Sequence, residues 1–556
     1  MNAAWVMVFS VLYFAAAYVF YGRFLKKVFG IDNSRPCPSH ELNDGIDYVP
    51  TPMPVLFGHH FASIAGAGPI VGPVLAAQFG WLPALLWITI GCVFIGAMHD
   101  FSAMFLSVRN KGRSIASVIE NELGYAGRQL FLLFCFAALI LVVTVFTTMV
   151  ADSFLSTPCV ATSSLLFIGM APLFGVAVNR KILSLAEGSL IFVPLLFCCI
   201  WMGTIIPIDL STILGSREAA RAVWIIVLLY YCLCASVIPV WVLLQPRDYL
   251  NSYLLYAMMI LGFAGIFAAH PQIVMPAIAA DVKTIPSLFP LLFVTIACGA
   301  CSGFHALVAS GTSAKQIDRE SHLLPVAYGG MLIEGLLAML AICSIGYLGM
   351  DQIKAMFAAK EAPQMIFASG LGHFCESLHI PFEIGRNFIA LAISAFILTS
   401  LDTATRLARF IWQELVLPGQ ENKQAQAPAT TGNSCPCRSL LGNRWVATLG
   451  VVILAGIMAF SGSGSQIWPV FGASNQLLAA LTLLAITLFL NRTKRPVLFA
   501  LLPLIFMLII SIWALLVLLQ QQWGKSIPLV TVSIVLLILA FILCFLGGKT
   551  LVKIKK

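Results

Sequence analysis

The chain has 556 residues, of which 60% are hydrophobic and only 10% are charged. Soluble globular domains carry about 25% charged residues, so this composition excludes a soluble enzyme. A mean hydropathy of +0.96 and repeated apolar runs of membrane-spanning length predict an all-α polytopic membrane protein. The net charge of +9 does not indicate nucleic-acid binding, because the Lys and Arg residues gather in short loops, as topology determinants do.

The apolar runs predict about fifteen helices. The first lies within 1–22 and has no small-residue cleavage site behind it, so we expect an extra, uncleaved N-terminal membrane helix. Most of the 32 Lys and Arg residues fall in alternate loops, which predicts an outside N-terminus and a cytoplasmic C-terminus. The other runs cover residues 56–78, 81–108, 129–152, 160–178, 185–208, 221–249, 251–270, 285–313, 323–349, 386–411, 445–461, 465–491, 497–520 and 527–548.

The run at 56–78 is the one that composition singles out. Its segment 58–73 reads GHHFASIAGAGPIVGP, with glycines and prolines too dense for a continuous helix. A helix that breaks at bilayer depth frees backbone N–H and C=O groups, which is tolerable only where they are buried in protein or line a cavity. The sequence therefore predicts a break inside this helix.

A second interruption is expected at Pro239, inside the run 221–249, which is the sixth helix when 56–78 is the first. A simple proline kink is the alternative. Breaks in helices one and six, each opening a five-helix unit, are typical of an inverted-repeat transporter. We therefore expect a ten-helix (5+5) core with repeats at 56–208 and 221–411, a cytoplasmic linker at 419–443 and a four-helix region at 445–550.

Several long motifs resemble the carbon starvation protein A family. They are DGIDYVPT at 44–51, FGHHFASIAGAGPIVGP at 57–73, QPRDYL at 245–250, TSLDTATR at 399–406 and WPVFGASNQ at 468–476. The resemblance implies a bacterial inner-membrane transporter related to the amino acid–polyamine–organocation superfamily. It also implies peptide use during carbon starvation, a stress response, or proton-coupled uptake of pyruvate.

Ionisable side chains inside membrane helices cost at least about 2.5 kcal/mol for Asp or Lys at a helix centre, so they mark candidate sites. Glu334 lies several turns from any basic residue in sequence, and desolvation favours its neutral form, which suits reversible protonation. Each candidate has a structural alternative. Glu334 could make a hydrogen bond between helices, and Asp100 could form a salt bridge to a basic loop. Asp402 could pair with Arg406 at i, i+4. Our candidates for ion coupling are Asp100, Glu334, His305 and Asp402.

Substrate contacts are expected beside the two interruptions. The half-helix that opens near Pro69 offers free N–H groups and a positive dipole end, which bind a carboxylate without an arginine. A neutral imidazole hydrogen-bonds a carboxylate or relays a proton, although two histidines packed between helices are the alternative. The candidate substrate-binding residues are His59, His60, Ser63, Gly66, Gly68, Ser236 and Trp241.

A cation site is the second candidate. In sodium-coupled relatives that the resemblance implies, hydroxyls of the eighth core helix and carbonyls of the broken first helix bind the ion. Ser310, Thr312 and Ser313 are the matching hydroxyls here. Small hydroxyl residues are also routine at membrane helix interfaces, which is the structural alternative.

These observations predict a secondary transporter, not an enzyme, that takes up pyruvate or small peptides with H⁺ as the coupling ion. Its partners are a small carboxylate or peptide and the lipid bilayer, with no cofactor, no resident metal and no nucleic acid. A sodium-coupled amino-acid or peptide transporter is the alternative. A haem-binding redox protein with His59, His60, His99 and His305 as ligands is less favoured, because no haem-attachment motif accompanies them.

Overall fold

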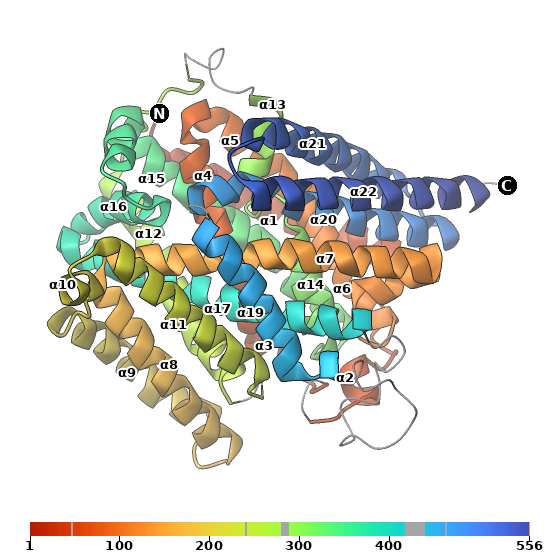
Figure 1. Cartoon of the computed structure of the whole chain (residues 1–556), viewed down its shortest axis with the longest axis horizontal. Coiled ribbons are helices and arrows are strands. Elements are labelled where there is room, and N and C mark those ends of the chain that lie inside the picture. The colour runs from red at the N-terminus through yellow and green to blue at the C-terminus, as the bar shows by residue number, and fades with distance from the viewer. Residues whose placement is uncertain (46–47, 240–241, 280–287, 417–439, 462–463, 555–556) are drawn as a thin grey trace.

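The structure is a computed structural model that describes residues 1–45, 48–239, 242–279, 288–416, 440–461 and 464–554. Within these ranges the chain is helical, with two isolated backbone bridges and no strand. In the same ranges, 14 helical segments are long and apolar enough to cross a membrane. The prediction of an all-α, multi-pass membrane protein is therefore confirmed (Figure 1).

The helices of the first half follow the predicted runs closely. The 42-residue helix α7 is longer than predicted and contains a kink at Gly124, whose φ of 75° lies in the left-handed region. The elements are α1 (Ala3–Phe29), α2 (Pro38–Glu41), α3 (Met53–Ile64), α4 (Gly68–Ala76), α5 (Trp81–Gly91), η2 (Cys92–Gly96), α6 (Ala97–Arg109), α7 (Ile115–Ser156), α8 (Pro158–Asn179), α9 (Leu185–Ile205) and α10 (Leu210–Leu214).

The second half contains a buried 14-residue helix, α16, in the segment between the long helices α15 and α17. The elements are α11 (Arg217–Val237), α12 (Leu244–Ala269), α13 (Leu288–Thr295), α14 (Gly303–Gly311), η4 (Ser313–Lys315), η5 (Glu320–His322), η6 (Leu324–Gly329), α15 (Gly330–Ala358), α16 (Pro363–Glu376), α17 (Phe382–Val416), α19 (Arg444–Ser461), α20 (Gly464–Arg492), α21 (Leu498–Gln522) and α22 (Ile527–Ile554).

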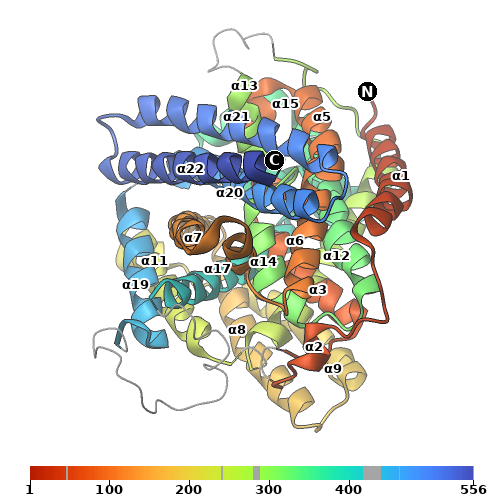
Figure 2. The ribbon, with the colours of Figure 1, turned by 90° about the vertical axis from the view of Figure 1, so that its right-hand side faces the viewer.

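Helices α7 and α17 form the centre of the molecule and pack against each other along much of their length. Figure 2 shows α7 nearly end-on, with α17, α19, α20 and α14 around it. Helix α20 packs against α7, α13 and α14, so part of the C-terminal region contributes to the centre of the bundle. The predicted linker at 419–443 lies mostly outside the described residues.

The predicted break in the first core helix is confirmed. Helix α3 ends at Ile64 and α4 begins at Gly68, with the Gly66 N–H turned back onto the Ile64 carbonyl at 2.8 Å. Pro69 in the first turn of α4 lacks an N–H and is pre-set for a helix start. Gly68 leaves room for the side chain of Cys298, because a Cβ at this position would lie 2.1 Å from the Cys298 Cβ.

The predicted break at Pro239 is wrong. The run 221–249 is the end of one helix and the start of another, because α11 ends at Val237 and α12 begins at Leu244. The last carbonyls of α11 find a partner outside the helix: the Arg406 guanidinium donates to the carbonyls of Ala235 and Ile238. Pro239 therefore lies in a connection between two candidate membrane spans.

The second break lies in the run that we expected to be continuous, at 285–313. Helix α13 ends at Thr295 and α14 begins only at Gly303. The side chains of Trp87 and Trp468 donate to the carbonyls of Ile296 (3.1 Å) and Thr295 (3.3 Å). These partners come from far along the chain, so local sequence does not reveal the break.

The two breaks lie against each other, and this contact generates a prediction. A Cβ on Gly72 would lie 2.8 Å from the Thr295 carbonyl oxygen and 3.1 Å from the Ile296 Cα, two backbone atoms that cannot rotate away. We expect Gly72→Ala to lower the free energy of unfolding by about 1–3 kcal/mol in thermal unfolding of the purified protein.

Gly169→Ala is the matched control, because Gly169 lies inside α8 and a Cβ added there would meet only open space. Its stability should stay equal or rise, since alanine is the better helix former. A Gly72→Ala protein as stable as the wild type would contradict the close approach of the two breaks.

Candidate functional site

Four fully buried ionisable side chains meet between α6, α14 and α15, and we call them the histidine–carboxylate cluster: His99, Asp100, His305 and Glu334. The Asp100 carboxylate binds the Nδ1 atoms of both His99 and His305, each at 2.8 Å. On its other side, the His305 Nε2 lies 3.3 Å from a Glu334 carboxylate oxygen. The structure thus brings together three of the four residues predicted for ion coupling.

This cluster is incompletely satisfied. Among the described residues, neither oxygen of Glu334 nor the Nε2 of His99 has a hydrogen-bond partner of good geometry. A buried polar group without a partner is costly, and a buried charge without a counter-charge is costlier still. Two carboxyls and two imidazoles in contact can share protons in several ways, so the arrangement is suited to binding and releasing a proton.

A second buried network, the arginine–aspartate cluster, contains Tyr231, Arg247, Asp248, Asp402 and His59. The Arg247 guanidinium forms a two-armed ion pair with Asp402 and donates to Asp248 at 2.8 Å. The Tyr231 hydroxyl donates to Asp402 at 2.7 Å, and the His59 Nδ1 lies 3.2 Å from Asp248. This network joins α3, α11, α12 and α17.

The cluster corrects the expected partner of Asp402. We predicted an i, i+4 pair with Arg406, but Asp402 binds Arg247 and Tyr231, while Arg406 donates to the end of α11. Arg247 and Asp248 were missed, because the run 221–249 put them at the mouth of an inner loop. The signal that would have revealed them is an Arg-Asp pair followed at once by the apolar stretch of α12.

The adjacent histidines of α3 serve different neighbours. His59 contacts the arginine–aspartate cluster, whereas the His60 Nδ1 bonds the Ser313 hydroxyl at 2.8 Å. His60 also packs beside Gly330, one turn before Glu334 on α15, since a Cβ on Gly330 would lie 3.5 Å from its ring. Helix α3 therefore stands between the two clusters.

Three of the other predicted substrate residues, Ser63, Gly66 and Gly68, lie at the first break. The Ser63 hydroxyl donates to the His59 carbonyl, and the Ser400 hydroxyl on α17 donates to the Ser63 carbonyl at 3.4 Å. A Cβ on Gly66 would lie 2.7 Å from that Ser400 hydroxyl. Ser236 instead faces Thr448 on α19, at 3.4 Å. Trp241 lies outside the described residues.

The three hydroxyls proposed as a cation site do not face one another. Those of Ser310 and Thr312 donate to carbonyls of their own helix, Ala306 (2.7 Å) and Val308 (2.8 Å). The Ser313 hydroxyl is engaged by His60. The hydroxyl that does reach a carbonyl at the first break is Ser400, which the sequence did not single out.

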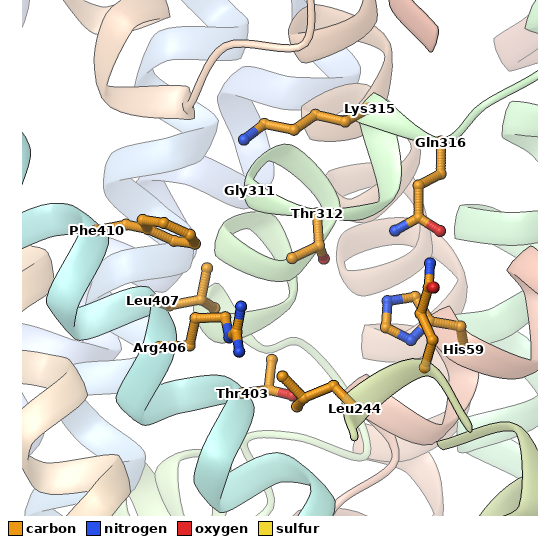
Figure 3. Close-up of a pocket in the computed structure, with 11 residues that line it drawn as sticks. His59, Leu244, Gly311, Thr312, Lys315, Gln316, Thr403, Arg406, Leu407 and Phe410 are labelled. Atoms are coloured by element: carbon orange, nitrogen blue, oxygen red, sulfur yellow. The ribbon is translucent and has the colours of Figure 1, made fainter. Parts of the chain in front are cut away.

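A cavity opens beside His59, and Figure 3 shows its lining. It is narrow and partly open, and it lies between α3, the start of α12, the end of α14 and α17. Apolar side chains form much of its wall, among them Leu244, Leu407 and Phe410. The polar and basic side chains of the lining are His59, Gln245, Thr312, Lys315, Gln316, Thr403 and Arg406.

Comparison with known proteins places the chain in a family. A family model described as "Carbon starvation protein CstA" matches residues 2–362 and 351–514. The peptide transporter CstA of Escherichia coli (strain K12) is 33% identical over 94% of this chain and 81% of that protein. The peptide transporter CstA of Bacillus subtilis (strain 168) is 32% identical over 98% of this chain and 96% of that protein.

A third relative carries a different name. The pyruvate/proton symporter BtsT of Escherichia coli (strain K12) is 32% identical over 92% of this chain and 80% of that protein. Among solved structures, a manganese transporter of Eremococcus coleocola in complex with an aromatic bis-isothiourea substituted compound covers 92% of this chain and 99% of its own. Its TM-score of 0.51 at 10% identity shows a shared fold and nothing about cargo.

The arginine–aspartate cluster yields a stability prediction. Asp402→Asn removes the negative charge that holds the buried Arg247 by two arms. We expect a loss of about 2–3 kcal/mol in the free energy of unfolding, because Asp248 still pairs with the guanidinium. Thermal unfolding of the purified protein measures it.

Asp152→Asn is the matched control, since Asp152 pairs with Arg221 where both side chains are partly exposed, 36% and 28%. Exposed pairs contribute little to stability. Equal effects of the two substitutions would contradict a structural role for the buried cluster.

Proposed function

The chain belongs to the carbon starvation protein CstA family, and from this premise we propose that it is a proton-coupled symporter for a small carboxylate such as pyruvate. The histidine–carboxylate cluster is the observation that carries the proposal. Relatives named as peptide transporters and as a pyruvate/proton symporter support a cargo with a carboxylate, which pyruvate and a peptide C-terminus share. The bacterial relatives support the inner membrane of a bacterium as its location. The distribution of basic residues favours an outside N-terminus and a cytoplasmic C-terminus.

The coupling proton is held between Glu334 and His305. With Glu334 neutral, Asp100 and a protonated His305 form a pair of opposite charges, and the cluster is neutral overall. When Glu334 gives up its proton, one negative charge stays in a buried site without a counter-charge. Release of the proton is thus favourable only together with a rearrangement that brings water or another charge to Glu334, which is the requirement for coupling.

The cargo carboxylate binds at the first break. The N-terminal turn of α4 follows directly on the gap at 65–67 and points its positive dipole end into it. His60 lies on the last turns of α3, between this gap and the cluster partner Glu334. Substrate binding at the break and proton binding at Glu334 therefore act on the same half-helix.

The two broken helices would be equivalent members of an inverted repeat. The pair α3/α4 opens the first unit, and we propose that α13/α14 opens the second in place of the segment around Pro239. The contact between the breaks, at Gly68 and Cys298, is the geometry that such a pairing requires.

The decisive experiment is uptake into proteoliposomes that hold the purified full-length protein. Labelled pyruvate and labelled alanyl-alanine are offered separately, with an inward proton gradient, an inward sodium gradient or neither. We expect the proton gradient alone to accelerate uptake of one of them. Acceleration by sodium alone would support the alternative coupling ion, and no acceleration by either gradient would contradict coupled transport.

Glu334→Gln tests the coupling group. Glutamine is neutral and similar in shape, so the cluster keeps its packing but cannot release a proton. For one proton per cargo, each pH unit of gradient supports about tenfold accumulation, and we expect the variant to lose it entirely. Exchange of labelled for unlabelled cargo without a gradient should remain, because exchange needs no net proton movement.

Glu383→Gln is the control, since Glu383 is exposed in the first turn of α17. It should accumulate cargo as the wild type does. A Glu334→Gln protein that still accumulates cargo in a proton gradient would assign the coupling proton to another group.

A further inference from the structure

The cavity of Figure 3 differs from the first break in the charges that line it. Its described lining includes the basic groups of Lys315 and Arg406 and the imidazole of His59, and no carboxylate. Asp248, which contacts His59 of the lining, and Asp402 are both bound by Arg247. The described lining of the cavity is therefore positively charged, and His59 forms part of its wall.

Among the residues that the structure describes, Lys315 is the cation of this cavity without a carboxylate partner. Its ammonium nitrogen lies 5.3 Å from the ring centre of Tyr48 and 5.8 Å from that of Phe410, and within the described chain it forms no ion pair. The two other basic groups are engaged, Arg406 by carbonyls at the end of α11 and His59 by Asp248. A partly desolvated ammonium held by two aromatic rings favours an anion from solution.

Hydrogen-bonding side chains complete the arrangement. In Figure 3, Gln316 points into the space below Lys315, and Thr403 faces it from α17. The Thr312 hydroxyl also lines this space, but its proton is donated to the Val308 carbonyl, so the available donors are the Gln316 amide and the Thr403 hydroxyl. Gln316 and Thr403 are nearly buried, so their polar groups are directed to the cavity and not to bulk water. Hydroxyl and amide donors beside a cation are the set that a carboxylate needs.

We propose that this cavity is a separate cytoplasmic-side binding site for the carboxylate of a small organic acid, with the Lys315 ammonium as its counter-charge. The cargo would occupy this site after it leaves the first break. The identity of the physiological ligand therefore rests on the proposed function. The basic residues of the adjoining loop, Lys315 and Arg319, put the cavity on the side that the charge distribution assigns to the cytoplasm.

The test separates the two faces of the membrane. Inverted membrane vesicles expose the cytoplasmic face and right-side-out vesicles the other, and exchange of labelled pyruvate gives a half-saturating concentration for each. For Lys315→Gln we expect this concentration to rise about tenfold in inverted vesicles, the loss of one charge-assisted hydrogen bond. It should change less than about twofold in right-side-out vesicles. Lys315→Arg keeps the charge and should restore the wild-type value.

Lys494→Gln is the matched control, because it removes a basic residue that is exposed in the loop between α20 and α21. An equal rise with Lys494→Gln would mean that general surface charge is responsible and would overturn the site. So would an unchanged value for Lys315→Gln, an equal change on both faces, or a change confined to right-side-out vesicles.

A binding measurement keeps the inference separable from the transport hypothesis. If wild-type vesicles exchange neither pyruvate nor alanyl-alanine, the proposed function fails. The site is then judged by thermal unfolding of the purified full-length protein with sodium pyruvate against sodium chloride. A stabilisation by pyruvate that Lys315→Gln abolishes and Lys494→Gln keeps supports it, and no stabilisation of the wild type overturns it.

Discussion

The structure depends on one constraint, which is that backbone groups freed inside a membrane bundle must find partners in the protein. At the second break, Trp87 and Trp468 donate to the carbonyls of Ile296 and Thr295, while the Asn475 side chain accepts from the Phe304 N–H at 2.9 Å. Helices α5 and α20 thus supply the hydrogen-bond partners that the unwound segment does not find within its own helix. The break exists because these helices surround it, and α20 belongs to the centre of the fold for the same reason.

Charged side chains buried in the bundle likewise need partners in the protein, and the two buried clusters differ in how far they find them. Arg247 is fully buried and is matched by Asp248 and Asp402, so this cluster is well paired and holds α12 against α17. The histidine–carboxylate cluster is less complete, because His305, at 3.3 Å, is the ion-pair partner of Glu334 within the described chain and no second cation joins it there. Pairing suits the first cluster to hold helices together, and incomplete pairing suits the second to the proton binding that we propose.

The sequence predicted those features that depend on local composition. The break at 65–67 follows from glycine and proline density, and Glu334 and His305 follow from the cost of ionisable groups in membrane helices. It failed where the partners are tertiary. Pro239 follows a helix whose end Arg406 caps, and at the second break distant tryptophans bind the carbonyls of Thr295 and Ile296. The Arg247–Asp402 pair spans 155 positions, and no periodicity reveals such a partner.

Helices α3 and α14 connect the two buried clusters and the cavity. Helix α3 carries His59 toward the arginine–aspartate cluster and His60 toward Ser313, which follows the end of α14. Helix α14 carries His305, the link between Asp100 and Glu334, and its far end opens onto the cavity beside Lys315. A shift of α3 along α14 would therefore alter the proton site, the contact with the arginine–aspartate cluster and the cavity together. Because each of these contacts is a discrete hydrogen bond or ion pair, the shift would occur between distinct states, which is what coupling of cargo to protons requires.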